Sequence, residues 1–310
     1  MYLPADAEWV ASINVRQILD SAVVKKYGLS RAETQLKNSD AQKLLDQIGL
    51  DPMKDVKTIT MAGPEDETIQ HKWVVIVRGT FDLSKIHAAA AAFAKDNPKD
   101  LKIDKAGDVP IYEGRAPDPR RGKNARESTS MFAAFLGKGV LVVSGSRDAI
   151  LDAVARHGGK KEGKVNKDLQ ALIRKQDNLK SFWMAGLATE QLRKQLAKNP
   201  QTSEFADKVK SLSGNIDLTD GVKASFRVHT SAADAAEKIK DLLDGGRSLA
   251  IFAIGTQPQL KQFAPLVTDV LKAFDFSQEK ETAIIALTIT SDMIEKGVKQ
   301  AKEQTGKKKE

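Results

Sequence analysis

Two stretches that lie far apart in the chain can be superimposed without a gap. They are Trp9–Ile18 (WVASINVRQI) and Trp183–Leu192 (WMAGLATEQL), with tryptophan on tryptophan and Gln17 on Gln191. Each opens with a short apolar run typical of a strand and passes into a helical pattern. The match predicts that the chain builds one kind of strand–helix unit twice.

Two further pairs of segments follow in the same order. The strand before Thr80 and the helix after it correspond to the strand and helix around Thr230. Ser146–Ile150 (SRDAI) aligns with Thr290–Ile294 (TSDMI), and the offset between the pairs shrinks along the chain. The copies are therefore expected to be colinear, with deletions in the second. Chance similarity between two ordinary strand–helix junctions is the alternative.

Each copy is expected to have the order β-α-β-β-α-β with a further helix. This is the order of a ferredoxin-like or split βαβ unit. We predict an α+β protein with mainly antiparallel sheets, in which residues 1–160 form the first repeat and residues 161–310 the second. Asp82, Asp148 and Asp292 stand where helices begin, and each is expected to be an N-cap that accepts hydrogen bonds from unpaired backbone N–H groups.

The pattern near the end of the chain predicts several helices. A helix from Ala232 is expected to stop at Gly245-Gly246, because glycine commonly ends helices. Leu249–Ile254 and Leu260–Phe274 also look helical, although Pro265 interrupts the second stretch.

Composition limits the classes of protein that fit. Hydrophobic residues make up 41% of the chain and charged residues 29%, which is ordinary for a folded protein and excludes wholesale disorder. The absence of cysteine excludes disulfides, thiol catalysis and cysteine-ligated metal sites. No apolar run approaches the ~20 residues of a spanning helix, so the protein is not expected to be transmembrane.

The segment Gly114–Ser130 is predicted to be a long loop with a concentration of positive charge. The net charge of the chain is +8, and this loop gathers several of its basic side chains. We expect it to bind an acidic protein or an anionic surface, the alternative being a solvated loop without a partner. No aromatic residue alternates with the basic ones to stack bases, so no specific nucleic acid is predicted. The candidate partner-binding residues are Arg115, Arg120, Arg121, Lys123 and Arg126.

The chain carries no pattern of residues that indicates catalysis. The four histidines fall in four different predicted elements, and none has a neighbour at the spacing of a metal-ligand pair. No phosphate-binding glycine loop, dinucleotide-binding glycine pattern or nucleophile elbow is present. We therefore predict no catalytic residues, no metal, no cofactor and a protein that is not an enzyme.

The start of the chain resembles a family of uncharacterised exported bacterial proteins. The resemblance rests on Leu3-Pro4-Ala5-Asp6-Ala7, on the strand Val10–Val15 with the helix after it, and on Gly49–Pro52 before Val56–Thr60. It implies a periplasmic or secreted location, with no established activity. Met1 would then replace a removed leader; a cytoplasmic location is the alternative.

Taken together, the residues and the resemblance predict a non-enzymatic, soluble binding or assembly protein of the bacterial envelope or secreted fraction. It would act through its sheet faces and the basic loop. A small-molecule or lipid-binding protein with a pocket between the two halves is the alternative. A broad apolar patch on a sheet face would favour the first function, and a cleft with converging polar groups the second.

Overall fold

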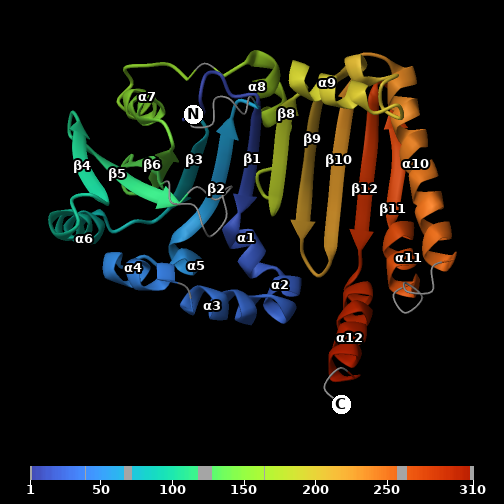
Figure 1. Ribbon diagram of the computed structural model, residues 1–310, viewed down its shortest axis with the longest axis horizontal. Coiled ribbons are helices and arrows are strands. Elements are labelled where there is room, and N and C mark those ends of the chain that lie inside the picture. The colour runs from blue at the N-terminus through green and yellow to red at the C-terminus, as the bar shows by residue number, and fades with distance from the viewer. Residues whose placement is uncertain are drawn as a thin grey trace. The chain divides into compact units, whose positions relative to one another are not determined.

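The computed structural model describes residues 2–38, 40–65, 72–117, 128–163, 165–256 and 264–307. The chain has an α+β fold with antiparallel sheets and divides into two compact units (Figure 1). Unit 1 comprises residues 1–19 and 29–175, and unit 2 comprises residues 20–28 and 176–310. Residues 160–163, where the sequence suggests a boundary, thus lie within unit 1.

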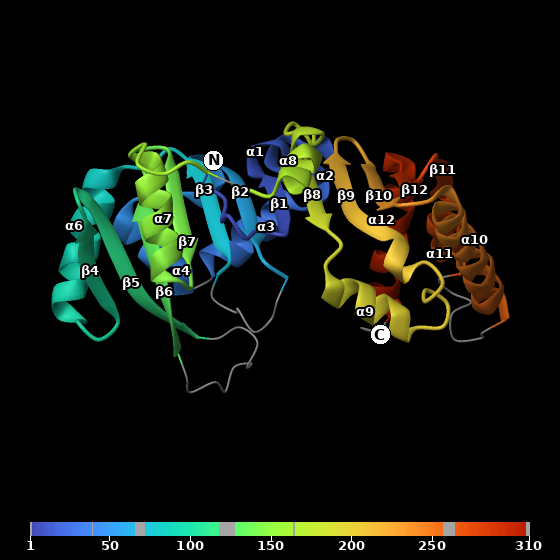
Figure 2. The same cartoon turned by 90° about the horizontal axis from the view of Figure 1, so that it is seen from above.

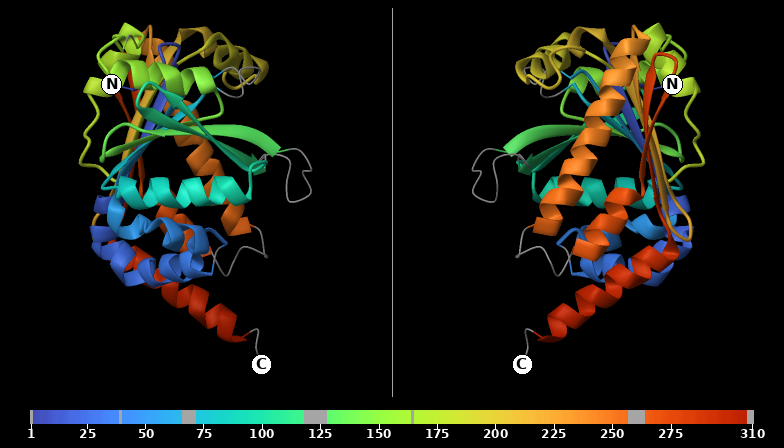
Figure 3. Two further views of the ribbon diagram at one scale, coloured as in Figure 1. Left: turned by 90° about the vertical axis from the view of Figure 1, so that its left-hand side faces the viewer. Right: turned by 90° about the vertical axis from the view of Figure 1, so that its right-hand side faces the viewer.

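Unit 1 begins with a strand that is followed by a run of short helices. Its elements are β1 (Trp9–Asn14), α1 (Val15–Asp20), α3 (Leu29–Lys37), α4 (Asp40–Ile48), α5 (Pro52–Asp55), β2 (Val56–Gly63), β3 (Val74–Gly79), α6 (Leu83–Asp96), β4 (Leu101–Ala106), β5 (Val109–Pro117), β6 (Ser128–Phe135), β7 (Val140–Ser144), α7 (Arg147–His157) and α8 (Lys167–Arg174). The strands of this unit lie in the order β1-β2-β3-β7-β6-β5-β4, and each pair is antiparallel. Helices α7 and α6 lie on opposite sides of the β4–β6 end of this sheet (Figure 3, left).

Unit 2 repeats this order of strands in a shorter form. Its elements are α2 (Ala22–Tyr27), β8 (Phe182–Leu187), α9 (Glu190–Lys198), the 3₁₀ turn η2 (Ala206–Lys208), β9 (Val209–Leu218), β10 (Val222–Thr230), α10 (Ala233–Thr256), α11 (Ala264–Lys272), β11 (Phe274–Glu279), β12 (Thr282–Ile289) and α12 (Ser291–Lys307). The strands lie in the order β8-β9-β10-β12-β11, again antiparallel throughout.

The core of unit 2 forms where α9 and α10 pack on one face of its sheet. Ala235, Ala236 and Ile239 of α10 pack with Val209 of β9 and Ala283 of β12. The alanines let the helix approach the strands closely. Figure 2 shows α10 running alongside the edge of the sheet that β11 forms.

The ferredoxin-like or split βαβ pairing is not the pairing that these strands adopt. A βαβ unit makes its two strands parallel, because the helix returns the chain to the end where the first strand began. Here β1 pairs with β2 antiparallel, and β8 pairs with β9 antiparallel. Helices α1, α3, α4 and α5 stay beyond the end of β1 at which β2 starts, so the chain never crosses back along the sheet (Figure 1).

The helix starts in the two units use matching caps, although not always the predicted residue. Asp82 caps α6 by accepting from the Lys85 amide, as expected. At α7 the cap is Ser146, two residues before Asp148, and its hydroxyl accepts from the amide of residue 149. Thr290, the aligned residue, accepts from the amide of residue 293 at α12. In both helices an uncharged hydroxyl accepts the hydrogen bond from the third following amide. Asp148 and Asp292 instead lie in the first turn, where their negative charge interacts favourably with the helix dipole.

Gly245-Gly246 does not end α10, contrary to the expectation from sequence. The helix runs without a break from Ala233 to Thr256. Both glycines are exposed and have no neighbouring atom that a Cβ would meet. Packing of Leu242 and Leu243 against the core just before them holds the helix on course, since tertiary contacts override the modest propensity cost of glycine. The residues from Phe274 are the strand β11, not the end of a helix.

Candidate binding surface

The sheet of unit 1 is apolar on both faces, but only one of them is buried. On the buried face, cross-strand neighbours form the row Ile111, Ala134, Val142 and Ile76. Their side chains are between 0% and 3% exposed. A second row on this face, with Val74, Ala62 and Val10, is equally buried. This face therefore supplies the core of unit 1.

The opposite face is covered at the β5–β6 end by α6. His87 of α6 stacks on Tyr112 of β5 and shares a hydrogen bond with its hydroxyl. Phe135 of β6 meets both rings edge-on, and Phe81 meets Phe135 in the same way. Burial raises the pKa of Tyr112 and keeps its phenol neutral. This aromatic cluster fixes α6 on one end of the face and leaves the other end without it.

At the β1–β2–β3 end, the same face presents a patch of aliphatic side chains that we call the open face. Met61 is 40% exposed. The other members are half-buried, in contrast to their immediate neighbours on the buried face. They form two cross-strand rows, Val77–Ile59–Ile13 and Val75–Met61–Ala11. The open face consists of Ala11, Ile13, Ile59, Met61, Val75 and Val77.

The dimensions of the open face follow from strand geometry. Three adjacent strands span about 10 Å across, and two successive rows lie about 7 Å apart along the strands. No side chain in either row carries a polar group other than the thioether of Met61, and the sheet ladder uses the backbone groups. The open face can therefore offer shape and apolar contact, but it cannot orient a polar ligand by hydrogen bonds.

The sequence contains a signal for this surface in β3. Val74–Val77 (VVIV) is a continuous apolar run, and such a run is typical of a strand covered on both faces. A strand that is apolar on both faces but fully buried on only one of them indicates a candidate interface on the other face.

The predicted basic loop is only partly within the described residues. Arg115 lies on β5, opposite Ser130 of β6, and its side chain is exposed. Its backbone amide donates to the carbonyl oxygen of Asp100 at 3.2 Å. The other candidate residues, Arg120, Arg121, Lys123 and Arg126, lie outside the described residues. Binding of an acidic partner or anionic surface by this loop stays a prediction.

The histidines of the described chain are bound to hydroxyl groups. His157 pairs with the Tyr2 hydroxyl at 2.9 Å. His229 lies between Ser213 at 3.0 Å and Thr282 at 3.1 Å, on adjacent strands. His71 lies outside the described residues. Among the residues described, no group of three histidine, aspartate or glutamate side chains is placed to hold a metal ion.

None of the helices in the described ranges combines the length and the apolar character that crossing a membrane requires. No protein-family model matches the chain. No curated protein matches it either. A solved structure, the crystal form I structure of TP0453, is similar with a TM-score of 0.47 at 10% identity, over 94% of this chain and 93% of that one. At that score the similarity does not establish a shared fold.

Proposed function

We propose that this chain is a non-enzymatic binding protein whose open face receives an apolar surface of a partner protein. The observation that carries the proposal is the contrast between the two faces of one sheet. Residues of the same aliphatic kind are buried on one face and half-buried on the other, with Met61 the most exposed. In the part of the chain that the structure describes, folding leaves part of this apolar area in water, and a partner would cover it.

The shape of the open face favours a helix as the partner element. An α-helix is about 10 Å wide with its side chains, which matches the width of three strands. The two rows, about 7 Å apart, would accept side chains from roughly two turns of its apolar stripe. Burying the exposed part of Met61 alone contributes about 1 kcal/mol, since complete burial of a methionine is worth roughly 1.5–3 kcal/mol.

A lipid ligand is the second candidate function, and one observation favours it. Because the open face has no hydrogen-bonding side chain, it would accept an acyl chain as readily as an apolar helix. The open face alone would leave the far side of a chain in water, so a lipid would need further cover.

Photo-crosslinking from position 61 tests the proposal and separates the two candidates. A photoreactive methionine analogue in place of Met61 would be activated in cells that produce the full chain. The expected result is a cross-link to one protein, mapped by mass spectrometry to an amphipathic helix. The matched control carries the same analogue at Leu179, which is 78% exposed and outside the open face. Cross-links to lipid would favour the second candidate, and equal labelling from both positions would overturn both.

The identity of the captured protein is then checked with charge substitutions. Met61→Asp should abolish its binding to the purified partner, while Leu179→Asp should leave binding unchanged. Leu179 is 78% exposed and Met61 40% exposed, and equal melting temperatures of parent and variants would show that both variants remain folded. Retention of binding by Met61→Asp would contradict the proposal.

We also propose an envelope or secreted location, which rests on the resemblance of the first residues to exported bacterial proteins. Fractionation of cells that express the natural gene tests it. Recovery of the protein with cytoplasmic markers would contradict it.

The basic loop is proposed as an accessory anionic contact. Charge reversal at Arg120, Arg121 and Arg126 should weaken retention on an anionic matrix without lowering the melting temperature. Unchanged retention would remove the idea.

Duplication of one ancestral unit is proposed for the two halves. It is supported by the matching orders β1-β2-β3-β7-β6 and β8-β9-β10-β12-β11 and by the aligned caps Ser146 and Thr290. An experimental structure in which these two sets of strands cannot be superimposed would contradict it.

A further inference from the structure

The outermost strands of the two units differ in how their free edges are covered. In unit 2 this strand is β11, and Arg247 of α10 donates to the carbonyl oxygen of Phe274 at 2.7 Å. In unit 1 it is β4, which pairs with β5 on one side and with no described strand on the other. Figure 3 (left) shows this end of the sheet with α7 above it and α6 below it. An uncovered edge of this kind can pair with a further strand.

The hydrogen bonds between β4 and β5 show which backbone groups of β4 face outward. The carbonyl oxygen of Asp100, just before the strand, accepts from the Arg115 amide of β5 at 3.2 Å. Directions alternate along an antiparallel strand, so the even-numbered residues of β4 also turn their backbone groups toward β5. The backbone groups of Leu101, Ile103 and Lys105 therefore face the free edge.

The middle of this edge is its most open point. The Leu101 amide donates to the carbonyl oxygen of Asn97 at 3.2 Å, and the Lys105 amide donates to the carboxylate of Asp104 at 2.8 Å. The outward amide and carbonyl of Ile103 have no such partner among the residues that the structure describes. The Ile103 side chain is also 38% exposed.

The side chains of β4 place opposite charges on one face. Ile103 lies on the α6 side of the sheet with its cross-strand neighbour Tyr112. Lys102 and Asp104 lie on the other side, where Asp104 pairs with Arg147 of α7. Lys102 has no partner within the described part of the chain. One positive and one negative side chain therefore stand two residues apart along the same face of the edge strand.

A second copy of β4 fits this edge in one register. A two-fold axis perpendicular to the sheet makes the two strands antiparallel and passes between two copies of one residue, because pairing with the next residue would exchange the faces. An axis at Lys102, Asp104 or Lys105 would set that charge against itself. An axis at Ile103 sets Lys102 against Asp104 twice. An axis at either end of the strand would leave most of it unpaired.

We propose that this protein forms a two-fold symmetric dimer in which the outer edge of β4 pairs with β4 of a second copy of the chain. At the axis the two copies of Ile103 exchange N–H···O bonds. The Lys105 amide donates to the Leu101 carbonyl of the second copy, which releases one oxygen of Asp104 for Lys102. That ion pair stands between hydrogen-bonded pairs, where cross-strand side chains are closest.

The charges make the edge selective. Lysines on an edge strand discourage pairing with strands in general, and this edge accepts a strand that brings an aspartate to each lysine. The dimer uses β4 alone, so it leaves the open face on β1, β2 and β3 available and does not depend on the function proposed for it.

A single introduced cysteine tests the register, because the chain has none of its own. Ile103→Cys should place two thiols opposite each other, with Cα atoms about 5.5 Å apart and within the range of a disulfide. Mild oxidation of the full chain is expected to give a disulfide-linked dimer on a non-reducing gel. The matched control, Lys105→Cys, keeps the ion pairs but separates its thiols by about 14 Å. It should link at least tenfold more slowly, and equal rates would overturn the proposed register.

Charge reversal tests the dimer itself by sedimentation equilibrium. The parent chain is expected to show a monomer–dimer equilibrium. Lys102→Glu and Asp104→Lys each set like charges against each other at two places and should weaken dimerisation at least tenfold. A one-to-one mixture of the two variants restores both opposite-charge pairs in a mixed dimer. Its affinity should return to within severalfold of the parent's, and native mass spectrometry would identify the mixed dimer by its mass.

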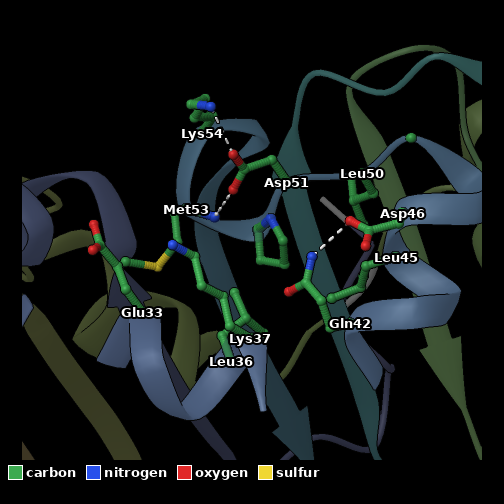
Figure 4. Close-up of a pocket in the computed structure, with 12 residues that line it drawn as sticks. Glu33, Leu36, Lys37, Gln42, Leu45, Asp46, Leu50, Asp51, Met53 and Lys54 are labelled. Atoms are coloured by element: carbon green, nitrogen blue, oxygen red, sulfur yellow. Dashed lines mark hydrogen bonds and ion pairs between the residues drawn. The ribbon is translucent and has the colours of Figure 1, made fainter. Parts of the chain in front are cut away.

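Recovery in the mixture also shows that both variants are folded. The matched control, Lys37→Glu, makes the same charge change at an exposed position of α3 (Figure 4) and should dimerise as the parent does. A parent chain that stays monomeric, charge variants that dimerise like the parent, or a mixture that does not recover would each overturn the proposal.

Discussion

Two isoleucines on neighbouring strands measure how differently the two faces of the unit 1 sheet are covered. Ile76 on β3 belongs to the buried face and is 3% exposed, whereas Ile59 on β2 belongs to the open face and is half-buried. They sit at adjacent register positions, since Ile59 pairs with Val77 and Ile76 pairs with Thr60. Replacing each with alanine removes the same atoms from the same sheet.

The expected costs follow from what surrounds each side chain. Isoleucine to alanine removes three carbon atoms, worth about 2.4 kcal/mol of transfer free energy if fully buried. At Ile76 a closed cavity adds to this, giving about 3–4 kcal/mol. At Ile59 part of the side chain is already in water and solvent fills the space, giving about 1–1.5 kcal/mol. The difference of about 2 kcal/mol is roughly a 30-fold change in the opening equilibrium.

Hydrogen exchange of the β2 and β3 amides is the appropriate measurement, because two compact units need not unfold in one step. Protection of these amides should fall about 30-fold further in Ile76→Ala than in Ile59→Ala. Protection of β9 and β10 in unit 2 serves as the internal control and should not change. The effects on partner affinity should rank the other way, so that Ile59→Ala weakens partner binding more than Ile76→Ala does. Equal losses of protection would show that both faces are equally covered, and the open face would cease to be a candidate.

Three smaller predictions concern single groups. The hydrogen bond from Lys54 lowers the pKa of Asp51. The ionised Asp51 therefore stabilises the fold above the ordinary aspartate pKa, and this stabilisation is lost as the pH falls through the lowered pKa. Lys54→Met should raise the pKa of Asp51 in a carbon-detected NMR titration. The pKa of Glu65 is raised by burial and by the charge of Glu8, so stability falls as pH rises through it; Glu65→Gln should stabilise by about 0.5 kcal/mol at neutral pH and by less in acid, as urea titrations would show. Gly79→Ala would place a Cβ 2.2 Å from a backbone carbonyl oxygen and should cost at least ~2 kcal/mol in thermal unfolding.

Local pattern predicted the elements well, while the relations between elements depended on packing that the sequence does not display. The strand patterns of Val56–Ala62 and of residues 131–144 correspond to β2, β6 and β7. Gly245-Gly246 was expected to stop a helix, but core contacts before it carry α10 through. The apolar run Val74–Val77 indicates a strand with two apolar faces, but which of the faces stays half-buried depends on where α6 ends on the sheet.

In the gapless match between the two copies, the paired residues Trp9 and Trp183 lie on different faces of their sheets. Both tryptophans lie on the first strand of their unit, Trp9 starting β1 and Trp183 second in β8. Trp9 lies on the same sheet face as Met61, which is the face that α6 covers further along. Trp183 pairs with Asn215 and lies on the sheet face away from α10. Because side chains alternate along a strand, a one-residue slip exchanges the two faces. Aligned by face, Trp9 corresponds to Phe182, and the gapless match owes its length to the strand–helix junction rather than to the tryptophans. Evidence for duplication therefore rests on strand order and on the caps Ser146 and Thr290, which no slip of a strand can produce.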